Sequence, residues 1–578
     1  MATIQSKITN GKKYWYIVES RRVNGKPRPV VLEYLGKADD LLARLSGLKT
    51  AHKLKSYSHG HVAALVDTCV KFNICSTLNQ FTQSDKDYIS DKPVRHNLTV
   101  GATLMLVAIC RACVTVSKNG FLEWVKTTSL GYLLRASFDK IDSQHFWNMM
   151  DCFPANSIAA AETMILKDVF KSVDLENDTL LYDTTNFYTY INTQNTDCSI
   201  SKRGKNKQKR CDLRQVGLAL VVTKQDMIPV FHHTYEGNMN DSKVFINVIN
   251  SITERITALG MKTPDHTIVF DRGNNSKKNL EFIQSLSLNF VGALTPYHHK
   301  ELITEASPKL LSTCIGDDVV GFYRTRKAIW GLDLTVVVVI SDKLKTGLIN
   351  GLYTSIEKCD EGIAKTNESL KRKTTRKRSK QQLEKSVRSL LTKHKSSDFI
   401  SFAVVGDEHD GFFIGHQINY DALAKAEEKL GFRIIMTNRH NWTSEEIIKA
   451  YHGQSFIEST FKNMKDQTHL SFKPQFHWTD QKIRVHYFCC VIGYLLNALL
   501  YKRAKEEAGF AGSMSSFLNK LDNMRLGSII SDTGKKGAPR VEYQLEVLDS
   551  DDQVLLDCLD LQNIHITRPK VSGLGVYN

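Results

Sequence analysis

The sequence predicts a mixed α/β fold around one central sheet, preceded by a β-hairpin and a block of helices. Between residues 179 and 295, three strand-like runs are followed by helix, strand, helix and strand, which is the order of a mixed sheet. Upstream, apolar residues change from alternation over the first forty positions to helical spacing over residues 59–173. A chain of 578 residues is too long for a single core and predicts roughly three or four domains.

Composition and charge narrow the class of protein. Hydrophobic residues make up 42% of the chain and charged residues 24%, which is typical of a globular protein and excludes a disordered or collagen-like one. Lys and Arg number 77 against 61 Asp and Glu, a formal net charge of +16. This balance favours a polyanionic partner, most often nucleic acid, with a ribosome-proximal or membrane-surface role as the alternative.

Cysteines and apolar runs indicate a soluble intracellular chain. Twelve cysteines are too sparse for a disulfide framework. Cys110 and Cys113 lack the second pair that a zinc site needs, which favours two apolar side chains on a buried helix. The chain opens without the apolar segment of a secretory signal. Residues 485–501 barely reach the length of a membrane span and contain His486 and Asn497, so we expect a core helix, no membrane partner and a cytoplasmic location.

The first part of the chain predicts two domains. KYWYIVESRRV and PRPVVLEYLG alternate in polarity on either side of Asn24-Gly25, which predicts a hairpin in a β-rich domain at residues 1–45. The cations of this hairpin suit DNA contact and a solvated face equally well; they are Arg21, Arg22, Lys26 and Arg28. Residues 58–175 have helical spacing and predict a helical domain, with or without a helix-turn-helix.

The rest of the chain alternates between sheet-forming segments and an insertion. We expect strands at residues 179–190, 214–223, 227–236, 266–273, 289–295 and 433–440, with helices at 242–260 and 276–286. One sheet domain would then occupy residues 176–300 and 433–505, around an insertion at 301–432. The insertion has further strands and a very basic helix, because residues 365–395 carry twelve Lys or Arg and two acidic residues. Residues 506–578 predict a helical C-terminal region, a candidate for protein–protein contacts.

Two aspartates end predicted strands of the same sheet. Asp183 follows the apolar run LLY, and Asp271 follows TIVF. Either one alone is most often a surface or turn residue, but neighbouring strand ends would bring both carboxylates together at an edge of the sheet. Two carboxylates that close repel each other unless a hard divalent cation neutralises them, so Mg²⁺ or Mn²⁺ is the expected ligand.

A third carboxylate lies on a predicted long helix at residues 443–465, which begins with a capping box of Thr443 and Glu446. Spacings of three, four and seven residues place a set of polar side chains on one stripe of this helix. The stripe consists of Tyr451, Gln454, Glu458, Lys462 and Lys465. The alternative is a plain solvated helix face.

In order along the chain, these segments resemble a known family. Asp183, QVGLALVV, EGNMND, IVFDRG and YHGQSFIESTFKNMK are similar to the DDE transposases of bacterial insertion sequences, over about residues 175–500. The similarity is to the group whose ribonuclease-H-like catalytic domain is interrupted by a β-rich insertion before the glutamate. In that group Tyr, Arg, Glu and Lys recur at the same spacing. Gln454 stands here where arginine is usual, a departure that affects one DNA contact and not the metal site.

The resemblance implies metal-dependent phosphoryl transfer on DNA. Asp183, Asp271 and Glu458 would hold two Mg²⁺ or Mn²⁺ ions about 3.5–4 Å apart. Water would first cut a phosphodiester at the end of the element, and the freed 3′-hydroxyl would then attack target DNA. This route needs no protein nucleophile, so Tyr451 would contact a phosphate or a base. The implied partners are double-stranded DNA, as terminal inverted repeats and target, and a second copy of the chain in an active homodimer.

Basic and aromatic residues extend the expected DNA interface. Residues 201–214 hold seven Lys or Arg against Asp212, among them Arg203, Lys205 and Arg210. Together with the block at 365–395, they could bind several phosphates. In related transposases an aromatic side chain of the insertion stacks on an extruded base; Trp330 is the candidate here, with a core tryptophan as the alternative. Two other functions stay open: a ribonuclease-H-like nuclease or resolvase that cuts without joining, and an inactive DNA-binding relative.

Overall fold

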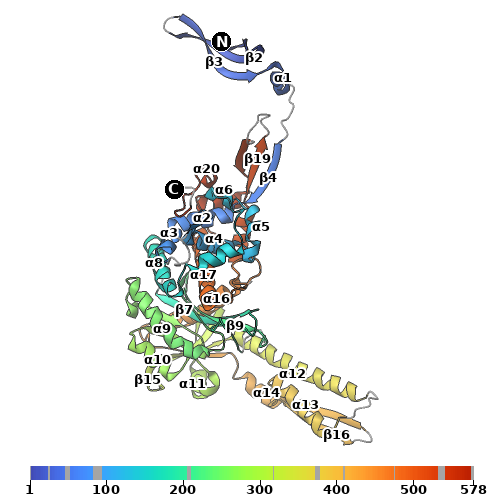
Figure 1. Cartoon of the computed structure of the whole chain (residues 1–578). Helices are drawn as coiled ribbons and strands as arrows, with labels where there is room; N and C mark the ends of the chain where they lie inside the picture. Colours follow the sequence, from blue (N-terminus) through green and yellow to red (C-terminus); the bar gives the residue numbers. More distant parts are fainter. Residues whose placement is uncertain are drawn as a thin grey trace.

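A computed structural model describes most of the chain, and Figure 1 shows its three parts: a small N-terminal sheet at one end, a central body, and an elongated arm at the other end. The predicted mixed α/β class is confirmed, because the body is built on a ten-stranded sheet with helices on both faces. The described residues are 2–23, 26–45, 52–82, 94–176, 178–204, 210–316, 318–371, 378–407, 411–473, 475–531 and 540–574.

The central sheet combines parallel and antiparallel strands in the order β10-β9-β7-β11-β12-β18-β15-β14-β13, with β8 paired to β9. β11 lies parallel to both β7 and β12, whereas β9, β10 and β18 pair antiparallel with their neighbours. The strands are β7 (Thr179–Thr189), β8 (Lys202–Arg203), β9 (Arg214–Thr223), β10 (Pro229–Glu236), β11 (Thr267–Val269), β12 (Asn289–Leu294), β13 (Leu311–Ile315), β14 (Asp318–Ile329), β15 (Leu332–Ser341) and β18 (Phe432–Thr437).

Both faces of this sheet are covered, which explains why its strands are apolar at consecutive positions. Leu180 and Tyr182 pack on one side against α9 (Asp241–Ala258) and α10 (Lys277–Ser285). Leu181 belongs to the larger core on the other side, which the sheet shares with the helical block and the long helix α17 (Asp480–Glu507). The predicted order of strands and helices between residues 179 and 295 is therefore present, with ends that differ by a few residues.

The helical block predicted at residues 58–175 packs on α17. It consists of α2 (Gly60–Lys71), α3 (Ile74–Gln80), α4 (Val100–Cys113), α5 (Phe121–Lys126), α6 (Leu130–Leu134), α7 (Ser143–Asp151) and α8 (Ile158–Ser172), with short strands β5 (Val94–Arg95) and β6 (Leu98–Thr99). Cys110 and Cys113 are buried free thiols of α4, as a core helix requires. α17 is long and apolar enough to cross a membrane, but 94% of its apolar window is buried inside the protein. The predicted core helix is thus confirmed.

A second, three-stranded sheet of order β20-β19-β4 joins the C-terminal region to the segment that follows the N-terminal sheet. The C-terminal region is less purely helical than predicted, because β19 pairs with both β20 and β4, a long-range contact that local spacing does not encode. Its elements are α18 (Met514–Asn523), β19 (Arg525–Ser531), β20 (Arg540–Leu545), α19 (Ser550–Cys558) and α20 (Ile564–Thr567), joined by β4 (His52–Ser58).

The N-terminal hairpin is present and has a third strand. β1 (Ala2–Thr9), β2 (Lys12–Val23) and β3 (Lys26–Gly36) form an antiparallel sheet, followed by α1 (Ala38–Leu45). Val23 pairs with Lys26 across the predicted turn; Asn24 and Gly25 themselves lie outside the described residues.

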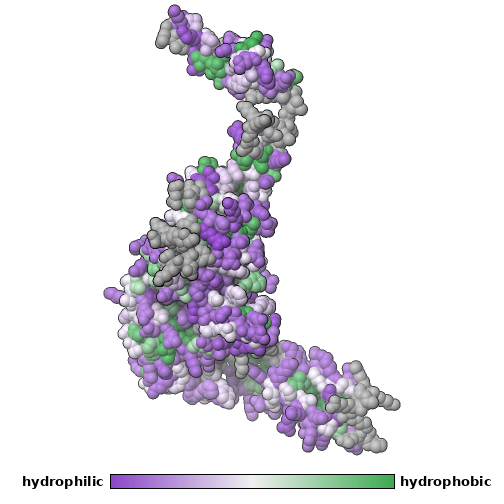
Figure 2. Space-filling view, viewed as in Figure 1, coloured by the Kyte–Doolittle hydropathy of each residue, from purple (hydrophilic) through white to green (hydrophobic). Residues whose placement is uncertain are grey.

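The insertion contributes to the sheet before it forms an arm. β13, β14 and β15 extend the central sheet, because β15 pairs with β18, so the boundary predicted at residue 301 separates strands that share one sheet. The arm begins at α12 and has its own apolar core around Ile356, Val387 and Ile414. Figure 2 shows mainly hydrophilic residues over its visible surface. Its elements are α12 (Asp342–Leu370), α13 (Lys380–Lys393), β16 (Ile400–Asp407), β17 (Gly411–Ile418) and α14 (Tyr420–Glu427).

Candidate active site

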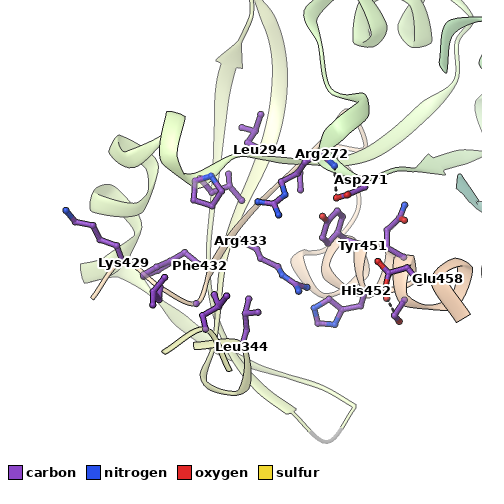
Figure 3. A pocket seen from close by; sticks show the side chains of 18 of the residues that line it. Asp271, Arg272, Leu294, Leu344, Lys429, Phe432, Arg433, Tyr451, His452 and Glu458 are labelled. Carbon is purple, nitrogen blue, oxygen red and sulfur yellow. Dashed lines mark hydrogen bonds between the residues drawn. The ribbon is translucent and has the colours of Figure 1, made fainter. Parts of the chain in front are cut away.

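Asp183, Asp271 and Glu458 line one open cavity of about 640 Å³ (Figure 3). They come from three elements that are far apart in the sequence: β7, the turn after β11, and α16 (Gln454–Asn463). The structure therefore brings together the three carboxylates that the sequence singled out.

Strand register positions the two aspartates. Leu181 of β7 pairs in parallel with Val269 of β11, and each aspartate follows two residues later. Asp183 Oδ1 accepts a hydrogen bond from the Thr184 amide at 2.8 Å. Asp271 Oδ1 accepts one from the Arg272 amide at 2.7 Å and caps a short 3₁₀ turn. Both carboxylates are thus oriented by their own backbone. Asp271 follows the end of β11 as predicted, whereas Asp183 lies within β7, which continues for six more residues, and not at a strand end.

Glu458 lies on α16, the second of two short helices that stand in place of the one long helix predicted. The capping box of Thr443 and Glu446 is present and begins α15 (Ser444–His452), but the single helix predicted to residue 465 is wrong: Gly453 separates α15 from α16. A Cβ atom on Gly453 would lie 3.1 Å from Leu181 Cδ2 and 3.0 Å from the Ala450 carbonyl oxygen. The glycine lets this junction approach β7 closely, and local apolar spacing does not reveal such an approach.

Two of the predicted stripe residues hold the site rather than face solvent. Tyr451 is buried, and its hydroxyl hydrogen-bonds Asp271; burial and then the Asp271 charge raise the pKa of the phenol to about 12. Figure 3 shows the ring of Tyr451 beside Asp271 and Glu458. Gln454 Nε2 donates to the Tyr182 carbonyl at 3.5 Å. These contacts attach the two helices to β7 and to the turn after β11, which carry the aspartates.

The two lysines of the stripe lie apart from each other. Lys465 follows the end of α16, donates to the Thr185 hydroxyl of β7, and has its ammonium 5.5 Å from the centre of the Phe187 ring. Lys462 is exposed on α16 and does not line the cavity. Lys465 does not line the cavity either, but it contacts β7 two residues beyond Asp183.

The cavity also contains cations that the sequence analysis missed. Arg272, Arg433 and Lys429 line it together with His452, and burial, followed by the charge of Arg433, lowers the pKa of His452. Arg272 directly follows Asp271 in the sequence and could have been noticed. Arg433 and Lys429 come from β18 and the segment before it, which reach the site because β18 pairs antiparallel with β12 and β15.

The remaining predicted DNA contacts fall elsewhere. Arg203 donates to the Thr193 hydroxyl at 3.0 Å, and Arg210 forms a bidentate pair with Asp212. Lys205 lies outside the described residues.

Trp330 lies at the β14–β15 turn, next to the Ile329–Leu332 pair, whereas the cavity lies at the other end of β15, where Ile340 pairs with Phe432. The structure does not bring Trp330 to the cavity. The Trp330 side chain is 37% exposed, so it is not a fully buried core tryptophan either.

Comparisons with family models identify the family of the chain. A family model described as "Transposase DDE domain" matches residues 177–473, just over half of the chain, and one described as "IS1634 family transposase, N-terminal domain" matches residues 1–57. Among solved structures, the chain is similar to a piggyBac transposase in a synaptic complex with hairpin DNA, with 8% identity, a TM-score of 0.36 and 79% of each chain covered. No match was found among curated proteins.

Proposed function

Because the chain belongs to the DDE transposases and is an insertion-sequence transposase that acts on DNA, we propose that Asp183, Asp271 and Glu458 are its catalytic carboxylates. The observation that carries this proposal is their convergence from three distant elements on one open cavity. The reaction would be metal-dependent cleavage at the ends of the element, followed by strand transfer into target DNA.

The donor set fits a hard divalent cation. Three carboxylates around one cavity repel one another, and oxygen ligands are those that Mg²⁺ and Mn²⁺ prefer. Asp183, Asp271 and Glu458 would hold two such ions. When bound, a pair of divalent ions supplies activation of the attacking oxygen and stabilisation of the leaving oxygen.

The other side chains of the cavity have distinct tasks in this proposal. Tyr451 orients Asp271 through its hydroxyl. Arg272 and Arg433 lie where the phosphate charges would be held, because guanidinium groups bind phosphate oxygens through paired hydrogen bonds. Lys465 would hold the DNA backbone beside β7. Two copies of the chain, each with one such cavity, would act on the two ends of the element in a DNA-associated, cytoplasmic homodimer.

Isosteric substitutions of the carboxylates test the proposal. The full chain is incubated with DNA that carries both element ends and Mg²⁺, and nicks and joined products are mapped. We expect Asp271→Asn and Glu458→Gln each to lower end cleavage roughly 10⁴-fold, as for catalytic groups that act as a unit, with DNA affinity nearly unchanged.

Glu445→Gln is the matched control, since Glu445 is a half-exposed acid of α15 paired with Lys449. Cleavage that survives in Asp271→Asn would refute the assignment. Nicks without any joined product in the wild type would instead favour a nuclease that cuts and does not join.

A further inference from the structure

Two histidines and one aspartate converge inside the body of the protein, apart from the candidate active site. His61 belongs to α2, Asp522 to α18, and His469 lies six residues beyond α16; these three residues do not line the cavity of Asp183. One ring nitrogen of each histidine and a carboxylate oxygen of Asp522 all lie within 4.8 Å of one another. Three segments that are remote in the sequence thus bring three metal-ligand atoms to one point.

Burial distinguishes this cluster from an ordinary surface ion pair. His61 is fully buried and His469 is 4% exposed, whereas the Asp522 side chain is 32% exposed. His61 Nδ1 lies 3.0 Å from Asp522 Oδ1, and His469 Nε2 lies 2.7 Å from Asp522 Oδ2. Burial by itself would raise the pKa of Asp522, but the hydrogen bonds of the two histidines outweigh it and lower the pKa. The carboxylate is therefore an anion that both imidazoles face.

The hydrogen bonds of Asn497 determine which nitrogen of His61 carries its proton. Asn497 Nδ2 donates to the Ala112 carbonyl at 3.3 Å, so the amide oxygen of Asn497 points to His61 Nε2, at 2.9 Å. An amide oxygen only accepts hydrogen bonds, so Nε2 must carry the proton, and a neutral imidazole then has its lone pair on Nδ1. That lone pair faces a carboxylate oxygen at 3.0 Å. Two acceptors that close repel each other unless a cation lies between them.

This cation is either a second proton on His61 or a metal ion. A second proton would make a charged imidazolium with no exposed surface, and a buried charge is costly to desolvate. A metal ion would leave both imidazoles neutral. It would also account for the convergence of His469 on the same carboxylate, which a proton shared by His61 and Asp522 does not require.

The ligand set suits zinc. Zn²⁺ is commonly held by imidazole nitrogens and carboxylate oxygens, and three protein ligands leave the fourth tetrahedral position to water. At zinc–ligand distances of about 2.0–2.2 Å, tetrahedral neighbours lie about 3.3 Å apart, which falls within the range of separations in this cluster. Metal-bound histidines usually donate their second ring N–H to an outer partner, and the Asn497 oxygen is that partner for His61.

We propose that His61, His469 and Asp522 bind one resident Zn²⁺ ion, distinct from the ions of the candidate active site. The ion would join α2 and α18 to the segment that leaves α16, the helix of Glu458. It would therefore hold the end of the candidate catalytic helix against the helical block and the C-terminal region. Its ligands are not the proposed catalytic carboxylates, so this inference does not depend on the proposed function.

The metal content of the full chain tests the site. Tag-free protein is purified in excess Mg²⁺, which occupies sites made of oxygen ligands alone, and its metals are measured by inductively coupled plasma mass spectrometry. We expect one zinc ion per chain. Asn497→Ala removes only the outer partner and should lower the affinity for added Zn²⁺ about 10- to 100-fold. Asp522→Asn and His469→Ala each remove a ligand and should lower it by roughly 100-fold or more, because a ligand matters more than its outer partner.

Two variants serve as controls. His416 on the arm pairs with Asp360 at 2.7 Å but belongs to no group of three ligands among the described residues, so His416→Ala should retain its zinc. Asp271→Asn should retain it as well, which would separate this ion from those of the candidate active site.

A measurement on the wild type covers the case that a ligand variant does not fold. Co²⁺ in place of zinc should give the visible absorption bands of a tetrahedral ion, and added Zn²⁺ should abolish them. Wild-type protein that contains no zinc, binds no added Zn²⁺ and gives no such bands would overturn the site and assign the cluster to a His61 imidazolium paired with Asp522. Zinc retained in full by folded Asp522→Asn, or lost in Asp271→Asn, would also overturn it. Bound zinc in a protein that cleaves no DNA would support this inference and refute only the proposed function.

Discussion

At the scale of single residues, the candidate site depends on groups that hold the carboxylates as much as on the carboxylates themselves. Tyr451, for which the resemblance implies a DNA contact, is 8% exposed, lines the cavity and has its hydroxyl on Asp271. Because its pKa is raised to about 12, the phenol keeps its proton throughout the range in which the protein would work and can donate it to the carboxylate.

Tyr451→Phe should therefore affect catalysis more than DNA binding. Loss of the hydroxyl removes one hydrogen bond to a charged group, worth about 1.5–3 kcal/mol, while the ring still fills its place. We expect end cleavage to fall by roughly 10- to 100-fold with unchanged affinity for end DNA, measured in parallel by nicking rate and anisotropy. Tyr420→Phe is the control. A variant that binds DNA weakly but cleaves normally at saturation would restore the DNA-contact role.

At the scale of elements, the junction between α15 and α16 determines how far Glu458 lies from the aspartates. The two helices approach β7 at Gly453, where the space for a side chain is filled by Leu181 and the Ala450 carbonyl. A helix that ran straight through this point with an ordinary residue would be displaced from the strand.

Gly453→Ala tests whether end cleavage depends on the close approach of this junction to β7. The added methyl group meets two atoms at 3.0–3.1 Å, so the junction must shift by a few tenths of an ångström, and we expect end cleavage to fall about tenfold because catalytic geometry tolerates little displacement. Gly351→Ala in α12 is the matched control, since its methyl would meet nothing within 4 Å. If both variants cleaved at the wild-type rate while remaining folded by circular dichroism, the close approach would not matter for catalysis.

At the scale of the whole molecule, the sheet domain contacts the helical block and the C-terminal region, and the arm extends from it. Asp522 of α18 contacts His61 of α2 at 3.0 Å and His469, just beyond α16, at 2.7 Å, so one carboxylate joins the helical block, the C-terminal region and the segment after the candidate catalytic helix. The basic block predicted as one helix at residues 365–395 is divided between the end of α12 and α13, and Arg372, Lys373, Arg376 and Lys377 lie outside the described residues. The cations of α13 are exposed and have no ion pair among the described residues: Lys380, Lys385, Arg388 and Lys393.

Neutralising three cations of α13 tests whether the arm binds DNA. If Lys385, Arg388 and Lys393 face phosphates, changing all three to Gln should reduce the slope of log affinity against log salt by about 2–3, because each released counterion contributes about 0.9. The effect should be the same on specific and unrelated duplexes. Lys140, Lys167 and Lys171 of the helical block, also exposed, provide the triple control. An unchanged slope would remove α13 from the DNA interface.

The sequence by itself determined the strands and helices between residues 179 and 295 and the two aspartates that follow apolar runs, because both depend on neighbours a few residues apart. The apolar runs before Asp183 and Asp271 predict buried strands, the Thr443–Glu446 capping box predicts a helix start, and the spacing of residues 485–501 predicts a core helix; the structure contains all of them. These signals are local, so no tertiary information is needed to read them.

Only the tertiary structure decided which residues share the site. The junction at Gly453 lies close to Leu181, a residue about 270 positions earlier, and Arg433, which lines the cavity, is paired with Val339 of β15. Trp330 is kept out of it because its turn lies at the far end of β15. Each of these depends on the distance between segments that are remote along the chain, and the periodicity of a single segment carries no information about that distance.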